Sequence, residues 1–164
     1  GGSALRRRWP AVSGQVREAQ HRCYTRRVDT IISIASDVLR PLPWLRLAVV
    51  FGSVARGTAR ADSDLDVGVV LDAEAPLDAL ERIELALGQG LGRPVDVVDL
   101  TTAPPLLRFE IAGDGRPVLE RDSQTWPRFR ARAMIDWFDW APTARLMARV
   151  RTERLRQQVD HAAD

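Results

Sequence analysis

The segment FGSVARGTARADSDLDVGVVL, residues 51–71, decides the fold of this 164-residue chain. The apolar run RLAVVF at 46–51 predicts a buried strand that ends in the turn Gly52-Ser53. Residues 65–71, LDVGVVL, predict a second strand. Glycine permits a tight turn and lets a ligand approach the backbone, and the free amides at the start of a helix favour a phosphate. Gly52 and Ser53 are therefore candidate phosphate-binding residues.

Two carboxylates stand at the start of the second strand. Asp64 and Asp66 flank Leu65, and side chains alternate along a strand, so both acids are expected on one face. Two acids this close repel each other unless a cation lies between them. Oxygen ligands of this kind suit magnesium or manganese. The sequence therefore predicts a cation site beside the Gly-Ser turn.

A third carboxylate is expected from the strand predicted over 94–100, PVDVVDL. Asp96 and Asp99 are three residues apart, so a regular strand directs them to opposite faces. We favour Asp96 because its neighbours Val95 and Val97 are expected to be buried on the core side. Asp99 is interpreted as a surface or helix-capping residue.

The rest of the chain alternates helices and strands. Helices are predicted over 11–24, 28–39, 77–89 and 104–112, a fourth strand over 117–120, and two helices within 124–158 that separate near Pro142. The apolar face of the helix over 77–89 is expected to comprise Leu77, Leu80, Ile83, Leu85 and Leu87. The pattern predicts a single α/β (α+β) domain over 1–164, with a small mixed sheet flanked by helices. Its core spans about 45–122, with N-terminal helices in 1–44 and C-terminal helices in 123–164.

Composition limits the cellular setting. The single cysteine excludes an internal disulfide and fits a reducing cytosol, and no apolar run is long enough to span a bilayer. We therefore expect a cytoplasmic protein without a membrane segment.

All 24 basic residues are arginine, and acids outnumber them only in the central part of the chain. An acidic centre between basic arms suits a cation site with an anionic ligand nearby, although solvated arginine-rich helix faces would explain the arms equally.

The spacing of these motifs resembles that of a known superfamily. Gly-Ser, ten intervening residues and Asp-x-Asp resemble the signature of the DNA polymerase beta-like nucleotidyltransferases. The string GSVARGTARADSDLDVGVV looks like their minimal nucleotidyltransferase branch, and the likeness continues through RPVDVVDL and LLRFEIAGDGRPVLERD, over about residues 45–122. Within that branch the chain is similar to the MntA-type antitoxins, which pair with HEPN-domain toxins.

The resemblance implies a polymerase beta-like fold and a role for each motif residue. Gly52 and Ser53 would hold the triphosphate of ATP, and Arg56 and Ser63 are further candidates for nucleotide contact. Arg56 is equally well explained as a surface residue that shapes the loop.

The acids are implied to act with two magnesium ions. Asp64 and Asp66 would bind both ions. Asp96 would complete the site nearest the attacking hydroxyl and help to deprotonate it. One metal then activates the nucleophile while the other stabilises the leaving pyrophosphate.

The resemblance implies that the chain is an antitoxin that transfers AMP from ATP to a tyrosine of a HEPN toxin and silences its ribonuclease activity. The alternatives are nucleotidylation of a small molecule such as an aminoglycoside, and a non-catalytic module that binds a toxin. The aromatic, arginine-rich tail over 126–150 is expected either to close the core or to contact a partner. Direct nucleic-acid binding is disfavoured because no helix-turn-helix or RNA-binding signature is present.

Overall fold

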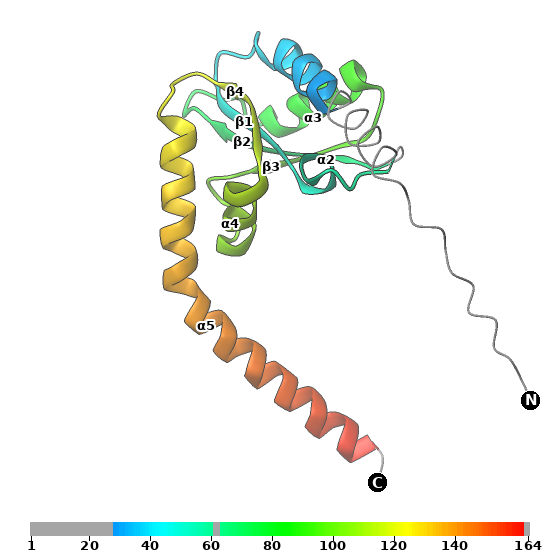
Figure 1. Ribbon diagram of the computed structural model, residues 1–164, viewed down its shortest axis with the longest axis vertical. Coiled ribbons are helices and arrows are strands. Elements are labelled where there is room, and N and C mark those ends of the chain that lie inside the picture. The colour runs from blue at the N-terminus through cyan, green and yellow to red at the C-terminus, as the bar shows by residue number, and fades with distance from the viewer. Residues whose placement is uncertain (1–27, 61–62, 163–164) are drawn as a thin grey trace, which may run out of the picture.

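The computed structural model describes residues 28–60 and 63–162, with side-chain surroundings described through Met147 (Figure 1). The helix predicted over 11–24 lies outside the described residues. Among those that are described, no helix combines the length and the apolar character needed to cross a membrane.

A four-stranded mixed sheet forms the centre of the fold. Its strands are β1 (Leu45–Phe51), β2 (Leu65–Leu71), β3 (Val95–Asp99) and β4 (Arg116–Glu120), in the order β3-β2-β1-β4. β1 pairs antiparallel with both β2 and β4, and β2 pairs parallel with β3. The predicted fold class, a small mixed sheet flanked by helices, is confirmed.

Helices cover both faces of the sheet because the strand side chains alternate between two apolar clusters. Val50 and Val67 point toward the helix over residues 28–39 and toward α3 (Ala79–Leu91). Val49 points the other way, into a cluster with α4 (Pro105–Asp114) and the start of α5 (Thr125–Ala162). In Figure 1, α3 accordingly lies on one side of the sheet and α4 on the other.

The apolar face predicted for the helix at 77–89 was partly wrong. Leu77 lies before α3 and is fully exposed, and Leu85 is 64% exposed. The buried residues are Ala79, Ile83 and Leu87, which are spaced four residues apart. With about 100° of rotation per residue, this spacing forms one stripe, and Leu85 points about 200° away from Ile83.

The two helices predicted after residue 124 are one helix. α5 runs from Thr125 to Ala162 with Pro142 in its interior. Proline removes one helical hydrogen bond and leaves the carbonyl of Phe138 without its partner. Both residues are exposed, so water can bond that carbonyl and the helix continues. Figure 1 shows α5 changing direction partway along its length, as an interior proline leads one to expect.

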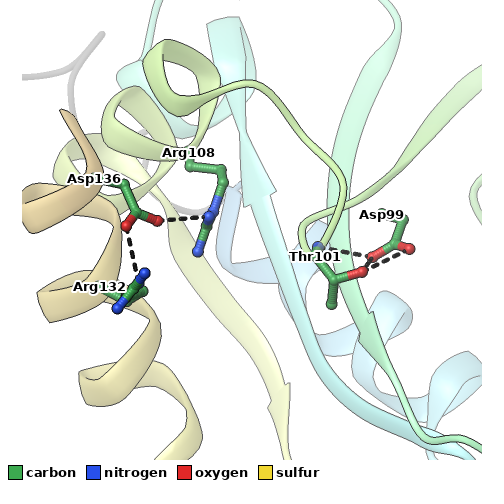
Figure 2. A network of polar contacts seen from close by, with 5 residues as sticks. All are labelled: Asp99, Thr101, Arg108, Arg132 and Asp136. Atoms are coloured by element: carbon green, nitrogen blue, oxygen red, sulfur yellow. Dashed lines mark hydrogen bonds and ion pairs between the residues drawn. The ribbon is translucent and has the colours of Figure 1, made fainter. Parts of the chain in front are cut away.

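An arginine–aspartate network attaches α5 to α4. Nη1 of Arg108 donates to Oδ2 of Asp136 at 2.8 Å, and Nε of Arg132 lies 2.8 Å from Oδ1 of the same carboxylate (Figure 2). The Arg108 guanidinium also lies 5.7 Å from the ring centroid of Phe129. Asp136 therefore joins an arginine of each helix, and the first half of α5 is held firmly against the sheet domain.

Candidate active site

The Gly-Ser turn lies directly beside the first carboxylate. Phe51, the last residue of β1, pairs with Asp66 in β2. Gly52, the next residue, therefore lies beside Asp66 at the end of the sheet. Gly52 has a φ of 69°, and a Cβ there would stand 2.1 Å from Oδ2 of Asp66. Only glycine therefore allows this backbone and the Asp66 carboxylate to occupy their places.

A short helix and a network of amides fix the turn. α2 (Gly52–Arg56) begins there, and the carbonyl of Ser53 accepts the amides of Gly57, Thr58 and Ala59. The Ser53 hydroxyl, by contrast, makes no hydrogen bond to any residue that the structure describes. It is half-buried and available to a ligand.

Asp66 and Asp96 face each other across the parallel strands. They are direct partners in the register of β2 and β3, which places the two side chains on the same face. Burial raises the pKa of Asp66 above its ordinary value, and the charges of Asp96 and Asp64 raise it further, whereas Arg56 opposes the shift. Three carboxylates therefore gather at this end of the sheet, where each added negative charge is unfavourable.

The acids do not converge tightly. In the described part of the chain, no three Asp, Glu, His or Cys side chains are close enough to form a complete metal site. Asp64 precedes β2, and both it and Asp96 are exposed. Neither side chain has a hydrogen bond or ion pair with the residues described, so both are free to turn toward a bound cation. Asp64, Asp66 and Asp96 are the residues that could hold one.

Asp99 is occupied elsewhere. Its Oδ1 accepts hydrogen bonds from the amide and the hydroxyl of Thr101, each at 2.8 Å (Figure 2). Its register partner in β2 is Val69, three residues beyond the partner of Asp96. Asp99 therefore fixes the turn after β3, as expected of a surface residue, although it does not cap α4.

The two remaining nucleotide-binding candidates, Arg56 and Ser63, each contact other parts of the chain. Arg56 approaches Asp114, at the end of α4, with 3.9 Å between Nη1 and Oδ2, and both side chains are about half exposed. The Ser63 hydroxyl accepts a hydrogen bond from the amide of Arg60 at 2.9 Å, and the Ser63 carbonyl accepts one from Nη2 of Arg93.

The sequence did not predict the involvement of Asp114 and Arg93. Asp114 stood in the turn-like string Gly-Asp-Gly, and no signal marked Arg93.

A mixed sheet that presents a Gly-Ser turn beside two in-register aspartates defines a nucleotidyltransferase class of fold. The chain belongs to the family described as "Polymerase beta, Nucleotidyltransferase", whose sequence profile matches residues 34–124, more than half of the chain.

Individual relatives agree with this assignment. The chain is 38% identical over 77 residues to the protein adenylyltransferase MntA of Shewanella oneidensis, a match that covers 46% of this chain and 54% of that protein. The chain thus spans about half the length of this relative. It is 28% identical over 122 residues to the protein adenylyltransferase MntA of Aphanizomenon flos-aquae, covering 66% and 81% respectively.

Among solved structures, a chain from a crystal structure of a toxin–antitoxin with AMP-PNP is similar, with a TM-score of 0.60 and 25% identity. That match covers 70% of this chain and 93% of the other.

Proposed function

We propose that this protein is a magnesium-dependent adenylyltransferase of the cytoplasm that transfers AMP from ATP to a hydroxyl of a partner HEPN-domain toxin, and thereby neutralises it. The observation that carries the proposal is the placement of Asp66 and Asp96 in register beside the Gly52-Ser53 turn. Its relatives in Shewanella and Aphanizomenon are named protein adenylyltransferases, which favours AMP as the transferred group and a protein as the acceptor.

The three carboxylates fit hard divalent cations. Oxygen-only donor sets suit Mg²⁺, and a cation would offset the burial and the repulsion from Asp96 and Asp64 that together raise the pKa of Asp66. Asp64, Asp66 and Asp96 are the proposed ligands. When bound, the magnesium ions neutralise charge on the phosphates and lower the pKa of the attacking hydroxyl.

The Gly-Ser turn is proposed to bind the triphosphate. Backbone amides approach a ligand closely at Gly52 because it has no side chain, and the Ser53 hydroxyl is free to donate. Arg56 already acts electrostatically on Asp66 and contacts Asp114 only at 3.9 Å. Its guanidinium can therefore leave that exposed ion pair for a phosphate at little cost. Ser63, whose hydroxyl accepts the Arg60 amide, retains its proton for a contact of its own.

The transfer exchanges one phosphorus–oxygen bond for another. The acceptor oxygen attacks the α-phosphorus and forms a new oxygen–phosphorus bond, while the bond from that phosphorus to the bridging oxygen breaks and pyrophosphate leaves. The hydroxyl proton passes to the carboxylate of Asp96, which is exposed and has no other partner among the described residues. Positioning and charge neutralisation supply most of the catalysis in such phosphoryl transfers.

An aromatic surface on α4 and α5 is proposed to contact the toxin. Phe109 stacks on Trp137 at 5.3 Å, and Trp137 lies 5.7 Å from Trp140. Phe138 remains 69% exposed and Trp140 37%. Exposed clusters of aromatic side chains are typical of binding surfaces.

The test is incubation with Mg²⁺, ATP labelled at the α-phosphate and a HEPN-domain protein from the same organism, followed by intact-mass analysis. We expect the partner to gain one or more AMP units, and the Asp64→Ala/Asp66→Ala variant to transfer none. A tight complex without any mass gain would instead support a non-catalytic binding module. Label found only on an aminoglycoside would support small-molecule modification.

A further inference from the structure

A groove lies beside the start of β3 and meets the candidate active site at a single residue, Asp96. It has a volume of about 480 Å³ and lies between α3 and β3. Glu81, Glu84 and Leu85 line it from α3, and Arg93 and Asp96 line it from the chain leading into and along β3. A ligand lying in the groove would therefore border Asp96, and a side chain that reached around the edge of β3 would meet its carboxylate on the face shared with Asp66.

The groove borders an unpaired strand edge. β3 is the outermost strand of the sheet, and no strand among the described residues pairs with its outer side. Such an edge offers a row of backbone donors and acceptors to an incoming chain. Extended peptides recognise sheets in this way, by adding a strand. The backbone thus favours a flexible peptide segment over a compact ligand.

The side chains of the groove carry a net negative charge. Glu81 and Glu84 are exposed and lie one turn apart on α3, and Asp96 adds a third negative charge at the end of the groove. Among the described residues of the lining, Arg93 contributes the only positive charge, but its Nη2 donates to the Ser63 carbonyl. Its Nε is buried and has no hydrogen-bond partner in the part of the chain that the structure describes. Leu85, which is 64% exposed, adds an apolar side chain to the lining. The charge therefore complements a cationic segment.

We propose that this groove is the acceptor site, and that it binds an extended segment of the partner protein in which arginine or lysine lies close to the hydroxyl that receives AMP. The proposal rests on the proposed transfer reaction and specifies its acceptor. Glu81 and Glu84 bind the basic side chains, the edge of β3 aligns the backbone, and the hydroxyl reaches Asp96. The two glutamates determine specificity and take no part in the transfer step.

The test uses two synthetic peptides, each with a single tyrosine, one flanked by arginines and the other by glutamates in the same places. The kcat and KM for AMP transfer are measured by mass spectrometry for the wild type and for Glu81→Gln/Glu84→Gln. The control is Asp37→Asn/Glu74→Gln, which removes the same charge from exposed positions that do not line the groove. The same three proteins are assayed on the intact HEPN partner and on kanamycin.

We expect the wild type to prefer the arginine peptide. The Glu81→Gln/Glu84→Gln variant should raise the KM for that peptide by about twofold to tenfold, as two exposed charge pairs imply. Its kcat and its KM for ATP should not change, and the control should match the wild type.

A variant that kept the wild-type preference and KM would overturn the acceptor groove while leaving the transfer reaction intact. Modification of kanamycin that depended on the two glutamates would overturn it too, because the groove would then serve a small cation. If ATP with Mg²⁺ raised the Tm but no acceptor gained AMP, the proposed function itself would fail.

Discussion

Asp66 and Asp96 are register partners on parallel strands, and their carboxylates share a face at the end of the sheet where the chain turns through Gly52 and Ser53. Their proximity is unfavourable in the free protein, since burial and the neighbouring acids raise the pKa of Asp66. A site that destabilises its own fold in this way is typical of functional residues. The predictions below start from this relationship.

Replacing Asp66 by asparagine should stabilise the free protein and abolish its activity. The folded pKa of Asp66 is raised, so the folded state retains a proton that the unfolded chain releases from about pH 3.9 upward. Stability conferred by the protonated form is therefore lost as pH rises from that value through the raised pKa. Asp66→Asn removes this loss, so the difference in Tm between variant and wild type should grow across this pH window and persist at neutral pH.

The same variant should lower AMP transfer by about a hundredfold or more, the usual effect of removing one electrostatic group from such a site. Mg²⁺ with ATP should raise the Tm of the wild type and leave that of Asp66→Asn nearly unchanged. A variant that was less stable than the wild type at pH 7 without Mg²⁺ would contradict the electrostatic argument.

The Gly52→Ala substitution should damage both stability and activity. A left-handed backbone costs a residue with a side chain about 1–3 kcal/mol. The new Cβ would also overlap Oδ2 of Asp66 and displace the carboxylate. The matched control is Gly113→Ala, whose Cβ would meet nothing within 4 Å and which lies in α4. That change should stabilise the protein by up to about 1 kcal/mol and leave transfer unaffected, as urea denaturation and a transfer assay can show.

The sequence predicted the strands well, and for a physical reason. Alternating apolar side chains mark β2 and β3, and the valines beside Asp96 indicate the orientation that its register with Asp66 requires. Asp64 was expected on the same strand and lies just before it. Burial on α3 was harder to predict, because Leu77 and Leu85 are as apolar as Leu87 and only the packed helix shows which stripe faces the sheet.

Long-range contacts could not be predicted from the sequence. The groove is lined by Glu81 of α3 and Asp96 of β3, which lie on two different elements. The hydrogen bond from Arg93 to the Ser63 carbonyl joins residues thirty positions apart. Continuity of α5 through Pro142 likewise depended on exposure, which decides whether water can satisfy the carbonyl that proline leaves unpaired.

Asp136→Ala should weaken the attachment of α5 to α4. The side chains of Arg108 and Asp136 are each only 18% exposed, so the substitution leaves a largely buried guanidinium with one bond fewer. A loss of about 1–3 kcal/mol in the free energy of unfolding is expected from urea titration. Asp37→Ala breaks an ion pair whose side chains are about 70% exposed and should change stability by less than about 0.5 kcal/mol. Equal effects of the two substitutions would refute this role for Asp136.

Phe138→Glu should weaken binding of the HEPN partner by at least about tenfold, since it places a charge in the exposed aromatic surface. Calorimetric titration measures the Kd, and thermal shift with ATP and Mg²⁺ should be unaltered. Leu77→Glu serves as the control, because this exposed leucine precedes α3, which covers the opposite face of the sheet. Wild-type affinity in Phe138→Glu would remove the aromatic surface from the proposed interface.

The most direct test of the catalytic centre compares two aspartates of the same strand. Asp96→Asn and Asp99→Asn are each incubated with ATP, Mg²⁺ and the HEPN partner, and the intact mass of the partner is measured against time. Asp96 faces Asp66, whereas Asp99 holds the turn at Thr101. We predict that AMP addition is lost in Asp96→Asn and persists near the wild-type rate in Asp99→Asn. Undiminished transfer by Asp96→Asn would contradict the account.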